Sequence, residues 1–166
     1  MRKSHSLRSC DWRLRRCVYW ILLCATSGTS RAQRSDEGQR DAIKRIQTKN
    51  LKILLIDDET EYRSSMRALL ERVFRARVED VDSGKAGVAK IKGGNRYDVI
   101  FLDLMMPEMN GNETRAELLR EDSSLFIAFM SAFSDSQEWQ IAKNSGAPLL
   151  VKPLELEHLI EVLTVP

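Results

Sequence analysis

Residues 52–58 read KILLIDD, a run dominated by Ile and Leu that is followed at once by two aspartates. A short, unbroken apolar run ended by polar residues is typical of a strand buried on both faces, as in parallel sheets. Asp57 and Asp58 therefore stand where such a strand ends. Ligands of open α/β sheets bind at these carboxyl ends, so the stretch predicts both a fold class and the sheet edge that carries the chemistry.

Three further apolar runs end in polar residues in the same way. VIFL (99–102) precedes Asp103, FIAFM (126–130) precedes Ser131, and LLV (149–151) precedes Lys152. We therefore expect three carboxylates, a hydroxyl and an ammonium at one edge of the sheet. The carboxylates would repel one another unless a cation neutralised them, and an all-oxygen set suits Mg²⁺. One acid could then act as a nucleophile, two could hold the metal, and Ser131 and Lys152 could bind phosphoryl oxygens. This arrangement suggests phosphoryl transfer.

The order of these motifs resembles a response-regulator receiver domain over residues 51–165. The motifs that carry the resemblance are the acid pair, the Asp103 strand end followed by MPEMNG (106–111), Ser131-Ala132 and Lys152-Pro153. The resemblance implies that Asp103 accepts a phosphoryl group from a phosphohistidine. It also implies that Mg²⁺ is held by Asp57, Asp58, Asp103 and the backbone carbonyl of Met105. Ser131 would bond the phosphoryl group, Lys152 would pair with it or with the free carboxylate, and the Lys152–Pro153 bond would be cis.

Each motif also has a plainer interpretation. The acid pair could be solvated or cap a helix, Asp103 could cap a turn, Ser131 could cap a helix, and Lys152 could be a surface lysine. Phosphoryl chemistry would be excluded only if all of these plainer interpretations were true at once. A phosphatase of the haloacid-dehalogenase type is disfavoured, because such enzymes need a second acid two residues after the nucleophile, where this chain has Met105.

Three departures from the receiver pattern bear on signalling. Asn110 stands where an aspartate is usual, and the segment between Gly146-Ala147 and Lys152 is one residue shorter than usual. Leu149 occupies the position of the aromatic ring that, in the family, moves inward on phosphorylation. These departures keep open an alternative, in which the chain is a binding module of receiver fold that signals without phosphorylation.

The remaining sequence alternates strand and helix patterns. Helices with apolar stripes are expected after Asp58 and near residues 156–163, a weak strand at 77–82, and further helices at 83–92, 112–121 and 135–145. Five strands alternating with five helices predict an α/β fold with a doubly wound, five-stranded parallel sheet. The flavodoxin-like strand order 2-1-3-4-5 follows from the resemblance.

The first 50 residues differ in character from the rest. They hold 12 Lys and Arg against 4 Asp and Glu, and all three cysteines, so no disulfide can join parts of the predicted core and a reducing compartment is indicated. We divide the chain into a basic, signal-like extension (1–34), a polar linker with a short helix (35–50) and a receiver domain (51–166). The apolar stretch of the extension is too short for an ordinary membrane span. Membrane contact and export remain alternatives to a disordered or non-native leader.

The sequence predicts a stand-alone receiver in the cytoplasm. Its phosphodonor would be a sensor histidine kinase or a phosphotransfer protein, and it would signal through contacts with an unidentified output protein. No DNA-binding pattern accompanies the receiver, so direct nucleic-acid binding is not expected. Enzymatic activity, if any, would be limited to assisting its own phosphorylation and dephosphorylation.

Overall fold

The computed structural model describes residues 31–165, so the expectations for residues 1–30, including the three cysteines, lie outside the described residues. The chain divides into one unit that ends at Ser35 and a second unit, Asp36–Pro166, which is the subject below. After helix α2 (Arg31–Lys49), the elements alternate as β1 (Lys52–Ile56), α3 (Thr60–Phe74), β2 (Arg77–Val81), α4 (Gly84–Lys92), β3 (Val99–Asp103), α5 (Gly111–Glu121), β4 (Ile127–Ser131), α6 (Gln137–Asn144), β5 (Leu149–Val151) and α7 (Leu156–Thr164). Within residues 31–165, no helix is long and apolar enough to cross a membrane.

The five strands form one parallel sheet in the order β2-β1-β3-β4-β5. This confirms the expected fold class and strand order. The central strand β3 is buried at every position, and four of the five residues of β1 are buried, as their unbroken apolar runs predicted. Because every pairing is parallel, the carboxyl ends of all five strands meet at one edge of the sheet.

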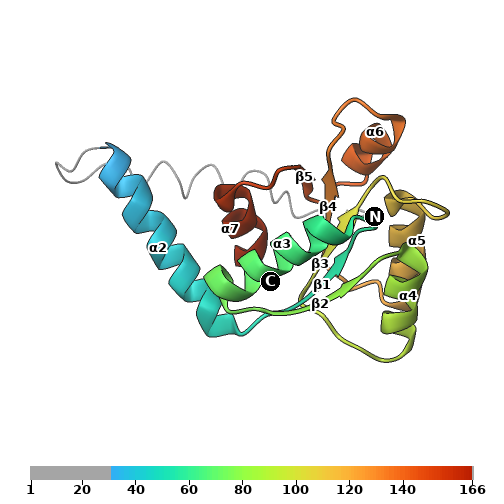
Figure 1. Cartoon of the computed structure of the whole chain (residues 1–166), viewed down its shortest axis with the longest axis horizontal. Coiled ribbons are helices and arrows are strands. Elements are labelled where there is room, and N and C mark those ends of the chain that lie inside the picture. The colour runs from blue at the N-terminus through green and yellow to red at the C-terminus, as the bar shows by residue number, and fades with distance from the viewer. Residues whose placement is uncertain (1–30, 166) are drawn as a thin grey trace, which may run out of the picture. The chain divides into compact units, whose positions relative to one another are not determined.

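Helices cover both faces of the sheet, as Figure 1 shows, with α3 and α7 on one side and α4 and α5 on the other. The first face has a core of α3, α7 and sheet residues that includes Leu70 and Leu159. The second has a core with Val88 of α4, Leu118 of α5 and Ala142 of α6. The sheet is therefore packed between two layers of helices.

Residues 36–49, assigned from sequence to a polar linker with a short helix, form the second part of α2. Ile46 is completely buried in the core of the α3–α7 face, and Ile43 packs against that core. The Gln47 amide donates a hydrogen bond to the carbonyl of Val73 at 2.7 Å, and Lys49 Nζ donates to the carbonyl of Thr164 at 3.1 Å. This part of α2 is therefore packed on the domain.

Candidate functional site

Asp57 is the residue that follows β1, and it is completely buried. Its Oδ1 accepts a hydrogen bond from the backbone N–H of Glu59 at 2.9 Å, and its own carbonyl accepts one from the Arg63 guanidinium at 2.7 Å. These contacts fix the turn from β1 into α3 and aim the second carboxylate oxygen along the sheet edge. Asp58, the next residue, is exposed.

Asp103 is the last residue of β3 and is only 4% exposed. Its Oδ2 accepts a hydrogen bond from the backbone N–H of Met105 at 2.8 Å. The loop after it folds back closely, because a Cβ on Gly111 would lie 2.5 Å from the Asp103 carbonyl oxygen. The glycine at the start of α5 thus lets the helix begin directly against the end of β3.

Lys152 joins the two buried acids. Its Nζ lies 2.6 Å from Asp57 Oδ2 and 2.6 Å from Asp103 Oδ1. The backbone N–H of Lys152 donates to the carbonyl of Ser131 at 2.8 Å, which continues the β4–β5 pairing, and the Lys152–Pro153 bond is cis as the resemblance implied. Residues 57, 103 and 152, far apart in sequence, therefore form one ion cluster at the expected edge.

The charges in this cluster do not balance. Burial raises the pKa of Asp103 and the charge of Asp57 adds to the effect, while Lys152 and the Met105 N–H oppose it. Burial by itself would lower the pKa of Lys152, but its ion pairs with Asp103 and Asp57 outweigh burial and raise that pKa. The two buried carboxylates thus share a single ammonium.

The other two side chains expected at the site are not in this ion cluster. Ser131 is buried, and its Oγ is hydrogen-bonded to the backbone of Phe133, accepting from the N–H and donating to the carbonyl, each at 3.1 Å. Asp58 faces solvent. Within residues 31–165, no three His, Cys, Asp or Glu side chains converge as a ready metal site. Asp57 and Asp103 nevertheless point their oxygens at a common cation, so the donor chemistry fits a hard metal ion such as Mg²⁺.

Sequence reasoning missed Tyr62, which lies in the first turn of α3. The Lys152 ammonium sits 4.2 Å from the centroid of its ring. The Tyr62 hydroxyl is buried and has no hydrogen-bond partner in the part of the chain that the structure describes. The available signal was an aromatic residue four positions after Asp58, one helical turn beyond the acids.

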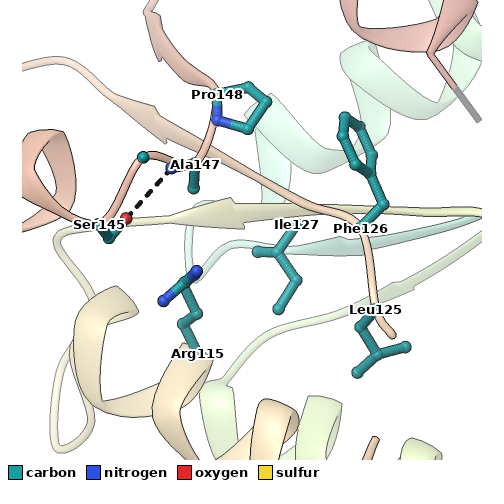
Figure 2. Close-up of a pocket in the computed structure, with 8 residues that line it drawn as sticks. Arg115, Leu125, Phe126, Ile127, Ser145, Ala147 and Pro148 are labelled. Atoms are coloured by element: carbon teal, nitrogen blue, oxygen red, sulfur yellow. Dashed lines mark hydrogen bonds between the residues drawn. The ribbon is translucent and has the colours of Figure 1, made fainter. Parts of the chain in front are cut away.

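A pocket of about 200 Å³ lies away from this cluster, near the amino ends of β4 and β5. Figure 2 shows Arg115 extending from α5 into the space between Ile127 and the turn at Ala147. The Arg115 Nε has no hydrogen-bond partner among the described residues. The pocket therefore offers one cation and mostly apolar walls at the sheet edge opposite Asp103, and it does not include the residues of the ion cluster.

Comparison with known proteins gives a family for the chain. The family model of the response regulator receiver domain matches residues 53–164. The two-component response regulator ORR42 of Oryza sativa is 30% identical over 70% of this chain and 87% of its own length. The transcriptional regulatory protein ResD of Bacillus subtilis is 30% identical over 69% of this chain, but this chain spans only 47% of ResD.

Solved structures agree with this match. The receiver domain of the Francisella response regulator 1452 superposes with a TM-score of 0.60 and 28% identity, over 70% of this chain and 95% of that one. The receiver domain of the sensor histidine kinase PA1611 of Pseudomonas aeruginosa has a TM-score of 0.63 over 69% of this chain and 95% of that domain. It is 24% identical, which shows the fold alone, and its own structure holds a magnesium ion in the active-site cleft. The chain thus belongs to the response regulator receiver domains of two-component signalling.

Proposed function

We propose that this receiver is phosphorylated on Asp103 by a sensor histidine kinase or a phosphotransfer protein. The observation that carries the proposal is the Lys152 ammonium, held 2.6 Å from a buried Asp103 oxygen and 2.6 Å from Asp57. A carboxylate at a strand end, next to a fixed cation, is placed to attack phosphorus while the cation meets the charge that develops on the phosphoryl oxygens.

The transfer needs no general base. An oxygen of the ionised Asp103 carboxylate forms the new bond to phosphorus as the bond from phosphorus to the donor's histidine nitrogen breaks, and the imidazole leaves with the electron pair. The Lys152 ammonium then pairs with the phosphoryl oxygens. The Ser131 hydroxyl, which donates to the Phe133 carbonyl in the resting protein, would turn to donate to the phosphoryl group instead.

The residues that would hold Mg²⁺ are Asp57, Asp58, Asp103 and the carbonyl of Met105. When bound, the ion would neutralise the carboxylates and the incoming phosphoryl oxygens. Two supports are the excess negative charge beside Lys152 and the magnesium ion in the PA1611 receiver domain. The exposed Asp58 carboxylate is free of the buried packing that fixes Asp57, so it can rotate toward the ion.

We further propose that the protein acts in the cytoplasm as a stand-alone receiver, with protein contacts as its output and no direct nucleic-acid binding. Residues 1–34 would be dispensable for phosphorylation, whether or not they contact a membrane. The alternative, signalling without phosphorylation, draws on Leu149. That side chain is partly buried against the α4–α6 core, where it offers no ring to relocate.

Intact-mass measurement tests the phosphorylation itself. We expect incubation with Mg²⁺ and phosphoramidate to add one phosphoryl group, and chelation of the metal to prevent the addition. Asp103→Asn should abolish the addition, whereas Asp135→Asn, a change at an exposed aspartate, should not. A mass increase that persists in Asp103→Asn, or that survives chelation, would contradict the assignment.

A further inference from the structure

We propose that Tyr62 is a positioning residue for phosphoryl transfer, and that the face of its ring holds the Lys152 ammonium between Asp57 and Asp103. The proposal rests on the proposed function at Asp103. It concerns a residue in the first turn of α3, outside the set of acids, hydroxyl and lysine considered so far.

The geometry around the ammonium is the first support. Lys152 Nζ lies 2.6 Å from an oxygen of each carboxylate and 4.2 Å from the centre of the Tyr62 ring. Ammonium groups are attracted to aromatic faces within about 6 Å, and the attraction grows when water is excluded. The Lys152 side chain is only 12% exposed. The ring therefore contributes a third attractive contact to a cation that is already held by two acids.

The hydroxyl of Tyr62 is the second support. The structure has another lysine over a tyrosine ring, Lys52 at 4.6 Å from the centre of Tyr97. There the phenol donates a hydrogen bond to Glu79 at 2.8 Å, which accounts for a tyrosine at that position. The Tyr62 hydroxyl is buried without such a partner among residues 31–165. Its ring, and not its hydroxyl, is thus the part of Tyr62 that engages a functional group.

Holding the ammonium matters because a lysine side chain is long and flexible. Without the ring, the side chain gains room to pair with one acid at a time, and it is then less well placed to receive the phosphoryl oxygens. The attraction of a partly desolvated cation to a ring corresponds to a rate factor of roughly 3- to 30-fold. We expect a loss of that size when the ring is removed and none when only the hydroxyl is removed.

The rate of phosphorylation by phosphoramidate with Mg²⁺ tests this in three variants. Tyr62→Leu should slow the reaction roughly 3- to 30-fold. Tyr62→Phe should react at the wild-type rate. Tyr97→Leu, the same change at the other cation–ring pair, should also leave the rate unchanged. A wild-type rate in Tyr62→Leu, or an equal loss in Tyr62→Phe, would overturn the proposal, and thermal unfolding of each variant checks that it is folded.

A second readout does not require phosphorylation. The methylene protons next to Lys152 Nζ should resonate upfield of ordinary lysines because they lie near the ring face, and Lys152→Arg assigns the signal by its loss. The upfield shift should persist in Tyr62→Phe and vanish in Tyr62→Leu. An unchanged shift in Tyr62→Leu would show that the Lys152 ammonium does not lie against the Tyr62 ring. A protein with the shift but no phosphorylation would overturn the proposed function and the role of Tyr62 in it, while the contact stands.

Discussion

Two clusters in this domain bring together a tyrosine ring, lysine ammonium groups and carboxylates, yet they differ in charge balance and burial. The Asp103 cluster, made of Asp57, Tyr62, Asp103 and Lys152, lies at the carboxyl edge of the sheet. It has two carboxylates for one ammonium, and both carboxylates are almost fully buried. The cluster therefore carries an excess negative charge where water has little access.

The Glu79 cluster consists of Lys52, Glu79, Lys90 and Tyr97, with Lys52 and Tyr97 near the amino ends of β1 and β3. Glu79 accepts from Lys90 and Lys52, each at 2.9 Å, and from the Tyr97 hydroxyl at 2.8 Å. The bonds to Lys90, Lys52 and Tyr97, in that order of size, lower the pKa of Glu79 to about 2. This single carboxylate therefore has three hydrogen-bond donors, and all three charged side chains are about a third or more exposed.

The two clusters thus differ in the sign of their excess charge and in their access to water. In the Glu79 cluster, cations exceed acids and water screens the remainder. In the Asp103 cluster, acids exceed cations and burial limits screening, so the protein carries an excess negative charge that a bound cation would relieve. This contrast predicts that equivalent substitutions in the two clusters change the free energy of unfolding by different amounts and, for the acids, in opposite directions.

The largest expected difference comes from removing one lysine in each cluster. Lys152→Met leaves two buried carboxylates without a cation and should lower the free energy of unfolding by about 3–5 kcal/mol. Lys90→Met removes one of two cations from a partly exposed acid and should cost less than about 1 kcal/mol. Urea unfolding at neutral pH without divalent metal measures both. Equal losses of stability in the two variants would contradict the difference in charge balance between the clusters.

Neutralising one acid in each cluster should change the free energy of unfolding in opposite directions. Asp103→Asn removes the excess charge and can keep the bond from the Met105 N–H, so it should raise the free energy of unfolding by about 1–2 kcal/mol. Glu79→Gln removes two partly exposed ion pairs and should lower the free energy of unfolding by about 1 kcal/mol. The same urea titrations decide the matter, and a loss of stability in both variants would contradict the excess charge assigned to the Asp103 cluster.

Acid titration sharpens the contrast with a smaller effect. The folded pKa of Glu79, about 2, is below its ordinary 4.5, so its stabilisation is present above pH 4.5 and is lost as the pH falls toward 2. Asp103 behaves oppositely: its folded pKa is raised above 3.8, so its contribution is present below 3.8 and is lost as pH rises through the folded pKa. Glu79→Gln should therefore flatten the fall in stability between pH 4.5 and 2, by about 1 kcal/mol after allowance for solvent screening. An unchanged slope would contradict this assignment.

The strands and the residues at their ends could be predicted because their signals are local. An apolar run such as KILLI buries both faces wherever the sheet lies, and the residue after it must stand at the sheet edge. The placement of Asp57, Asp103 and Lys152 at one edge follows from parallel pairing alone. The fold class and the position of these three residues could therefore be predicted from the sequence alone.

Other features depend on contacts between distant segments, which no local pattern encodes. Residues 36–49 are polar apart from a narrow stripe, so the burial of Ile46 becomes evident only when α3 and α7 supply the surface beneath it. The Tyr62 ring meets a lysine 90 positions later in the chain. The bonds of Ser131 to the Phe133 backbone depend on the geometry of the turn after β4, so the resting position of the hydroxyl could not be anticipated.

Chemical mapping of the phosphorylated residue is the most direct test of whether Asp103 accepts the phosphoryl group. Borohydride reduces an aspartyl phosphate to homoserine, so peptide sequencing by mass spectrometry after phosphorylation and reduction identifies the acceptor. We expect homoserine at position 103, with unphosphorylated protein as the control. Homoserine at position 57 or 58, or none in a chain that has gained a phosphoryl group, would contradict it.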